Sequence, residues 1–156
     1  GEEKNRKITS FYDLANINSK AGIGYDIHRL KENLPLILCG VRIPNNKGLV
    51  AHSDGDVATH AIIDALLSAA GLRDIGYYFP DTDEKYKDIS SLILLSEVKI
   101  KLEKLNLKII SLSLLIIAEN PRLSPFVEEM KEKIKSILDI NDFTVSLKTN
   151  EGTGDI

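Results

Sequence analysis

AHSDGDVATHAIIDALLSAAG, residues 51–71, is the segment that decides the fold, because it marks both ends of a helix. Ser53 or Asp54 is predicted to cap the helix, and Asp56 in the first turn suits the helix dipole. Apolar residues then recur at helical spacing, at Val57, Ala61, Ala65, Leu66 and Ala69. Gly71 supplies the stop. The segment therefore predicts one amphipathic helix that starts at a polar turn.

Strand-type and helical segments alternate around this helix. The strand-type segments are residues 21–29, 36–43 with a break at Gly40, 107–118 and 143–147. Helical periodicity returns in residues 90–105 and after Ser124-Pro125. Residues 74–88 are rich in glycine, aspartate and tyrosine without a period, which predicts a long loop. We therefore expect an α+β fold of the α/β sandwich type, with one mixed β-sheet and helices packed on one face.

Length and composition suit a single domain. The chain has 156 residues, of which 43% are hydrophobic and 28% charged, as in ordinary globular proteins. A net charge of −3 gives no basic surplus, which argues against a nucleic-acid-binding protein. Cys39 is the only cysteine, so no intrachain disulfide forms, and no apolar run is long enough to span a membrane. We expect a flexible polar leader at residues 1–20 and one domain at residues 21–156.

One aspartate and two histidines form a candidate metal site. Asp26 and His28 are two residues apart on a predicted strand, so their side chains point to one face. His60 lies on the first helix, one turn before Asp64, which could hold a histidine ring nitrogen from behind. Two histidines and one carboxylate leave one tetrahedral position open, as catalytic zinc sites do. Taken alone, however, a histidine such as His60 is more often a half-buried helix residue than a metal ligand.

Three further segments are candidates for binding anions or metals. Residues 52–56 (HSDGD) sit at a helix N-terminus, where free amides favour a phosphate, although a plain capped helix start is the better explanation when the segment is taken alone. Residues 79–83 (FPDTD) form an acid-rich loop or a solvated turn. Residues 149–152 (TNEG) follow a strand, so Glu151 could meet a metal, although a simple turn is the better explanation when the segment is taken alone.

The order and the amino-acid sequences of these clusters resemble those of one family, the 2-C-methyl-D-erythritol 2,4-cyclodiphosphate synthases. The matching stretches are GIGYDIHR (22–29), GVRIP (40–44), AHSDGDVATH (51–60), DIG (74–76), FPDTD (79–83) and AENPRL (118–123). The resemblance runs from about Gly22 to Glu151. The combination of D-x-H, H-S-D-G-D-V-x-x-H and F-P-D-T-D is highly specific to that family.

The resemblance implies a role for each matching residue. It implies one zinc ion per subunit at Asp26, His28 and His60, and a magnesium or manganese ion at Glu151. It implies that His52 and Thr149 stabilise the transition state. The implied contacts with the phosphates and the methylerythritol portion are Ser53, Asp64, Asp74, Ile75, Gly76, Phe79, Pro80, Asp81, Thr82 and Asp83. The implied cytidine contacts are Ala118, Glu119, Asn120, Pro121, Arg122, Leu123, Ser124, Lys148 and Asn150.

The resemblance also implies an assembly and a location. Members of the family form homotrimers in which the zinc side of each site belongs to one subunit and the cytidine pocket to the next. They occur in plastids and in bacterial cytoplasm. The polar leader and the AT-type composition favour a plastid-type organelle, such as an apicoplast or chloroplast stroma, with the bacterial cytoplasm as the alternative. The sequence departs from the family at its end: Asn150 replaces a usual threonine, and the expected C-terminal strand with its arginine is missing after Ile156.

Two other functions fit parts of the sequence. A zinc phosphohydrolase would use the same three ligands to activate water, but the second full ligand set of the usual two-metal hydrolase is not evident. A metal-stabilised interaction module would bind the ion for stability, so that chelation would unfold it. The cyclase differs from both, because it must release cytidine monophosphate and form a cyclic diphosphate.

Overall fold

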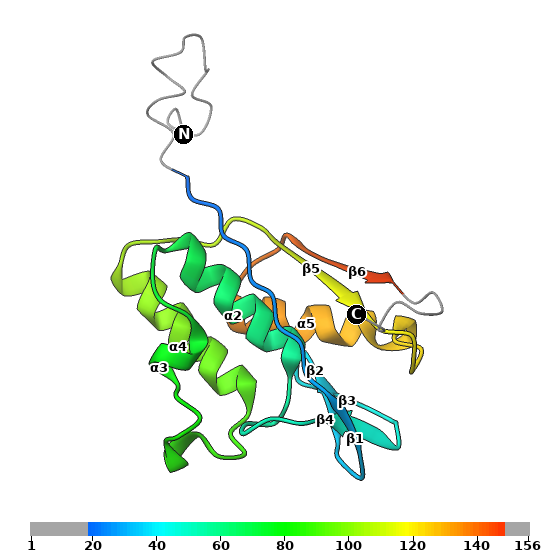
Figure 1. Ribbon diagram of the computed structural model, residues 1–156. Coiled ribbons are helices and arrows are strands. Elements are labelled where there is room, and N and C mark those ends of the chain that lie inside the picture. The colour runs from blue at the N-terminus through cyan, green and yellow to red at the C-terminus, as the bar shows by residue number, and fades with distance from the viewer. Residues whose placement is uncertain (1–18, 149–156) are drawn as a thin grey trace.

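Three helices and six short strands make up the main architecture of the computed structural model, which describes residues 19–148 (Figure 1). The helices are α2 (Val57–Ala69), α4 (Ser91–Lys104) and α5 (Val127–Leu138), with a single turn α3 (Ile75–Tyr78) and the 3-10 turns η2 (Glu84–Tyr86) and η3 (Ser124–Phe126). The strands are β1 (Leu30–Glu32), β2 (Leu36–Leu38), β3 (Val41–Ile43), β4 (Lys47–Leu49), β5 (Leu112–Ile117) and β6 (Phe143–Lys148).

The strands pair two by two. β1 pairs with β4 and β2 with β3, both antiparallel, whereas β5 and β6 are parallel. The α+β class is therefore confirmed, but the prediction of one mixed sheet is wrong for the described residues, which form three two-stranded sheets. The break predicted at Gly40 is confirmed as the turn between β2 and β3, where Gly40 has a φ of +72°.

Residues 21–29 do not form the predicted strand. They run extended along α2, and a Cβ added at Gly22 or Gly24 would collide with the α2 backbone at Ala65 or Ala61. The small residues thus serve a close approach of two backbones and not a ladder of strand hydrogen bonds. The predicted alternation is nevertheless present, because Ile23, Tyr25 and Ile27 are exposed while Gly24 and the Asp26 side chain face α2.

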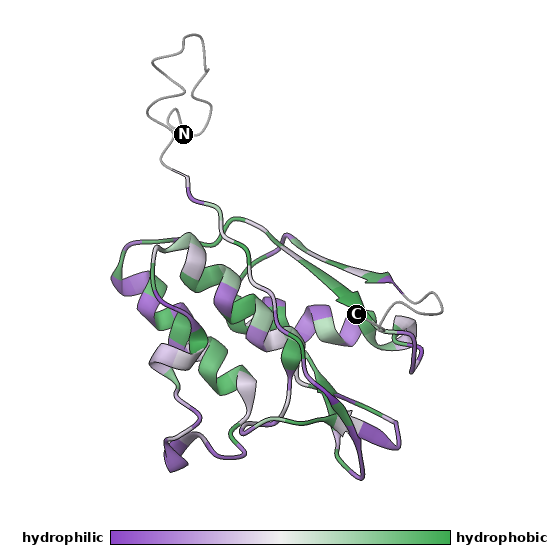
Figure 2. Cartoon of the chain, viewed as in Figure 1, coloured by the Kyte–Doolittle hydropathy of each residue, from purple (hydrophilic) through white to green (hydrophobic). Residues whose placement is uncertain are grey.

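The core lies between the helices. α2 contributes Ile63 and Leu67, α4 contributes Leu95 and Val98, and α5 contributes Met130 and Ile134. All six side chains are fully buried. Figure 2 shows hydrophobic turns on α2 and α4, while the loop from α3 to α4 and the tips of the short hairpins are hydrophilic. The helical periodicities predicted for these segments are confirmed, because each places its apolar stripe in this core.

Three local predictions need correction. The cap of α2 is Asp56 and not Ser53 or Asp54, because the Asp56 side chain accepts the amide hydrogen of Thr59. Residues 74–88 are not a plain loop, since α3 and η2 lie within them. The strand predicted from residue 107 begins only at Leu112. The predicted stop of α2 is confirmed, with Gly71 at a φ of +70°.

Within the described residues, no helix is long and apolar enough to cross a membrane.

Candidate metal centre

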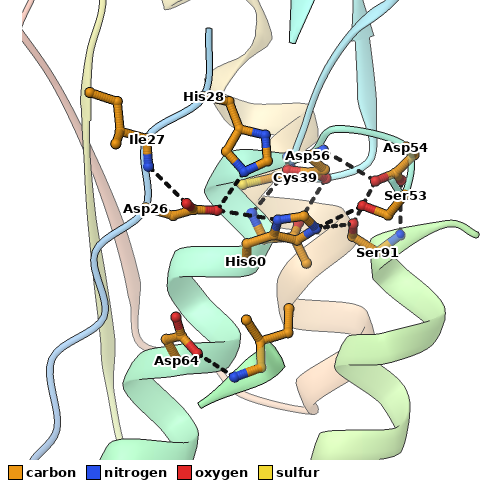
Figure 3. A network of polar contacts seen from close by, with 12 residues as sticks. Asp26, Ile27, His28, Cys39, Ser53, Asp54, Asp56, His60, Asp64 and Ser91 are labelled. Atoms are coloured by element: carbon orange, nitrogen blue, oxygen red, sulfur yellow. Dashed lines mark hydrogen bonds and ion pairs between the residues drawn. The ribbon is translucent and has the colours of Figure 1, made fainter. Parts of the chain in front are cut away.

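Asp26, His28 and His60 come together as the candidate metal-ligand set (Figure 3). Asp26 Oδ2 lies 3.0 Å from His28 Nε2 and 3.2 Å from His60 Nδ1. Their three ligand atoms all lie within 4.8 Å of one another. The sequence prediction that these residues share one site is therefore confirmed in its geometry.

Two segments far apart in sequence position the three side chains. The extended residues 19–29 present Asp26 and His28, two residues apart, toward α2. His60 lies on the first turn of α2, where its amide donates to Asp56 O at 3.0 Å. His60 is only 8% exposed, so the set is closed on its helix side and more open on the side of residues 26–28.

The electrostatics of the set favour a charged carboxylate beside the imidazoles. Burial raises the pKa of Asp26, but hydrogen bonds with His28 and His60 outweigh it and hold that pKa far below its usual range. The hydrogen bond with Asp26 in turn raises the pKa of His28, against the opposing effect of burial. The aspartate is therefore ionised at neutral pH, as a metal ligand must be.

The donor set fits a small divalent ion. Two atoms that each lie about 2.0–2.1 Å from a tetrahedral zinc are about 3.3 Å apart, close to both Asp–His distances here. Two imidazole nitrogens and one carboxylate oxygen are ligands that zinc accepts, and a zinc ion held by only these three would have room for a substrate oxygen. The structure thus supports a metal site at these residues.

Hydrogen bonds hold His60 on the side away from Asp26. Its Nε2 lies 2.8 Å from Ser91 Oγ and 3.1 Å from Ser53 Oγ. The prediction that Asp64 holds a histidine ring is wrong, because Asp64 Oδ1 accepts the amide hydrogen of Ile75 at 2.8 Å and so fixes the start of α3. Sequence reasoning missed Ser91, whose contact with His60 spans 31 positions and has no local pattern.

A buried carboxylate, Asp56, ties the β2–β3 turn to α2. It accepts the amide hydrogens of Cys39 at 2.8 Å, Gly40 at 2.7 Å and Thr59 at 2.9 Å, and the Thr59 hydroxyl at 2.8 Å. Burial raises the pKa of Asp56, an effect that its hydrogen bonds with Thr59 and Gly40 oppose. Because His60 is one turn away, this clamp fixes the helix end that carries it.

The turn at residues 52–54 is joined to the segment that leads into α4. Asp54 N donates to Ile89 O at 3.1 Å, and Asp88 N donates to His52 O at 2.9 Å. On its outer side, His52 Nε2 lies 3.4 Å from Asp83 O. The HSDGD turn and the FPDTD loop, which the sequence predicted as separate substrate-binding segments, are therefore neighbours.

A model of the YgbB family matches residues 19–156. The chain belongs to this family. A protein of Caldicellulosiruptor bescii named 2-C-methyl-D-erythritol 2,4-cyclodiphosphate synthase is 52% identical over 137 residues, covering 86% of this chain and 87% of its own length. One of Clostridium acetobutylicum with the same name is 50% identical, with coverages of 86% and 88%. The family resemblance predicted from the motifs is thus confirmed.

A solved YgbB-type structure shares the fold. It is described as 2C-methyl-D-erythritol-2,4-cyclodiphosphate synthase in a form bound to CDP, and it matches with a TM-score of 0.80 at 40% identity. The match covers 85% of this chain and 90% of the solved chain. Both named relatives come from bacteria, so they support the bacterial alternative and give no support to the predicted plastid-type organelle.

The cytidine segment predicted from the YgbB-type motifs follows β5. Ala118 N donates to Lys148 O at 2.9 Å, so the carboxyl ends of β5 and β6 lie together. Arg122 Nε donates to Ser124 Oγ at 3.0 Å, whereas Leu123 is 1% exposed, so its side chain belongs to the core. The predicted residues Thr149, Asn150 and Glu151 lie outside the described part of the chain.

Proposed function

We propose that this chain has the activity of a 2-C-methyl-D-erythritol 2,4-cyclodiphosphate synthase, a phosphorus–oxygen lyase of the non-mevalonate isoprenoid pathway. It would convert 4-diphosphocytidyl-2-C-methyl-D-erythritol 2-phosphate to the 2,4-cyclodiphosphate and cytidine monophosphate. The observation that carries the proposal is the convergence of Asp26, His28 and His60 in a chain 52% identical to a protein of that name.

We assign zinc to Asp26, His28 and His60, and magnesium or manganese to the substrate diphosphate with Glu151. When bound, these cations neutralise phosphate charge and orient the reacting oxygens. The surroundings support the need for them, because the Asp26 and Asp64 carboxylates interact with each other and with His60. An anionic substrate would be repelled by these carboxylates without added positive charge.

The chain's own residues would bind and position the substrate. A phosphate monoester has a second pKa of about 6 and is mostly a dianion at neutral pH, so no strong general base is required. His52 and Ser53, at the turn before α2, are proposed to contact the phosphates, with His52 and Thr149 stabilising the transition state. Residues 74–76 and 79–83 are proposed to hold the methylerythritol portion. Positioning then accounts for most of the rate.

We propose that residues 118–124, with Lys148 and Asn150, form the cytidine pocket of a site shared between copies in a homotrimer. The CDP-bound form of the solved relative supports a cytidine-linked ligand. Exposed apolar side chains on the outer side of residues 19–29 and on β5 support the contact between copies: Ile23, Tyr25, Ile27, Leu115 and Ile117. From the bacterial relatives, we propose the bacterial cytoplasm as the location.

A product assay tests this function. The chain is incubated with the diphosphocytidyl substrate, zinc and magnesium in oxygen-18 water, and the products are separated by mass. A cyclic diphosphate without the heavy isotope, together with free cytidine monophosphate, is expected. A linear product containing the isotope would identify a phosphohydrolase instead. In parallel, His60→Ala should lose both zinc and turnover while staying folded, and unchanged zinc content would contradict the ligand assignment.

Mixing two inactive variants tests the shared site. His60→Ala lacks the zinc ligand of one subunit, and Arg122→Ala alters the predicted cytidine pocket of the other. After the two are refolded together, interfaces that pair an intact zinc set with an intact pocket should regain activity. A monomer by light scattering, or mixed trimers that stay inactive, would contradict the shared site.

A further inference from the structure

A fully buried hydroxyl lies directly behind His60. Ser91, the first residue of α4, is 0% exposed, and its Oγ is 2.8 Å from His60 Nε2. This contact is on the opposite side of the imidazole from Nδ1, which faces Asp26 Oδ2. Ser91 therefore touches the candidate metal site only through the ring of His60.

The Ser91 hydroxyl also forms a hydrogen bond with a second partner, Asp54. It donates to Asp54 Oδ1, while the Ser91 amide donates to Asp54 Oδ2 at 2.8 Å. Asp54 Oδ1 also accepts the amide hydrogen of Asp56 at 3.1 Å. Because the Ser91 hydroxyl donates to Asp54 Oδ1, its proton points toward Asp54.

This direction decides which nitrogen of His60 carries the proton. Because the Ser91 proton points to Asp54, the side of its oxygen that faces His60 offers a lone pair. His60 Nε2 must then be the N–H donor, which leaves Nδ1 with its lone pair directed at Asp26 and His28. Without this contact, the Asp26 carboxylate at 3.2 Å would favour a hydrogen on Nδ1, and that nitrogen could not bind a metal.

We propose that Asp54 and Ser91 form a hydrogen-bond relay that fixes the Nε2–H tautomer of His60 and thereby presents Nδ1 as a metal ligand. Ser91 is a positioning residue, because it acts only through His60. The proposal rests on the ligand role of His60 argued above. Ser53 Oγ, at 3.1 Å, can accept the same proton, but it is half-buried at the proposed phosphate site, whereas Ser91 is enclosed and aligned by Asp54.

A purely structural role for Asp54 and Ser91 would be to start α4. The amide bond from Ser91 to Asp54 serves that role, and Ser90, at the cap position, makes no side-chain cap bond. Ser91→Ala keeps this amide bond and removes only the hydroxyl, so it separates the two roles. Ser96→Ala is the matched control, because it removes a hydroxyl from the same helix that donates only to Leu92 O at 2.9 Å.

The test reads the tautomer and the metal affinity without any substrate. Nitrogen-15 NMR of the metal-free protein should show His60 as the Nε2–H form, shifting toward Nδ1–H in Ser91→Ala and not in Ser96→Ala. Zinc affinity, measured by competition with a chelator, should fall roughly 10- to 100-fold in Ser91→Ala alone. An unchanged tautomer and unchanged zinc affinity would overturn the relay.

The outcomes also separate this proposal from the function. Wild-type protein that binds no zinc would contradict the metal site itself, whereas wild-type zinc binding with an unaffected Ser91→Ala would contradict only the relay. If Ser91→Ala does not fold, Ser91→Cys keeps the volume and offers a thiol, which is a weak donor and acceptor. The same tautomer shift and a smaller loss of affinity are then expected, and their absence overturns the relay equally.

Discussion

Removing the Asp56 carboxylate should destabilise the fold strongly. Asp56→Ala deletes the cap of α2, which is worth about 1 kcal/mol. It also leaves the amide hydrogens of Cys39 and Gly40 without an acceptor, at about 1–3 kcal/mol each. The variant also removes the cost of burying a carboxylate, which offsets part of this loss. The raised pKa of Asp56 reflects that cost of burial. We expect a net loss of about 3–5 kcal/mol in the free energy of unfolding.

Thermal unfolding of the metal-free protein at a fixed concentration measures this loss. At roughly 2–4 °C per kcal/mol for a chain of this size, Tm should fall by about 6–20 °C. Thr59→Val removes only one of the four hydrogen bonds and should cost about 1 kcal/mol. Asp83→Ala removes an exposed cap of η2 and should change Tm little. A Tm for Asp56→Ala within 2–4 °C of wild type, about 1 kcal/mol, would refute the clamp.

Three further outcomes follow from the site. Gly24→Ala should lower both stability and zinc affinity, because its Cβ would push residues 19–29 away from α2. Gly76→Ala, whose added Cβ would have its nearest contact at 3.6 Å, should leave the free energy of unfolding nearly unchanged. Calorimetry measures the stability and chelator competition measures the zinc affinity. The hydrogen bond between Asp26 and His28 raises the pKa of His28, so it should stabilise the metal-free fold fully below about pH 6.5 and less as pH rises through the raised pKa. In urea titrations at several pH values, Asp26→Asn should remove this fall of the free energy of unfolding with pH. An unchanged pH dependence would contradict the role of the hydrogen bond. Cytidine diphosphate should raise Tm more than adenosine diphosphate if residues 118–124 bind cytidine, and equal shifts would count against that pocket.

The helices could be predicted from sequence because their information is local. The periodic apolar residues of α2 and α4 place both helices within two residues of their observed ends. The strand pairings could not, because each depends on a partner elsewhere in the chain. Residues 21–29 have the alternation of a strand, yet they pack against a helix. α3 escaped prediction for the same reason, since its first amide is held by Asp64, eleven positions earlier.

The three candidate ligands could be predicted from sequence, but the residue that holds His60 in place could not. Asp26 and His28 share a face because side chains alternate along an extended segment, and His60 follows the HSDGD turn in the same sequence motif. Ser91 carries no such signal, because an isolated serine at the start of a helix reads as an ordinary cap residue. Only the fold shows that residues 52–54 and 88–91 lie side by side, which places the Ser91 hydroxyl against the imidazole.

α2 explains why fold and site depend on each other, because different sides of one helix serve different partners. Its large apolar residues, such as Ile63 and Leu67, enter the core. A row of small residues, Ala61 and Ala65, admits the backbone of the extended segment that carries Asp26. The polar row of Asp56, His60 and Asp64, one turn apart, binds the β2–β3 turn, the ligand set and α3 in succession. A larger side chain in the small row would therefore shift Asp26 relative to His60 without touching either ligand.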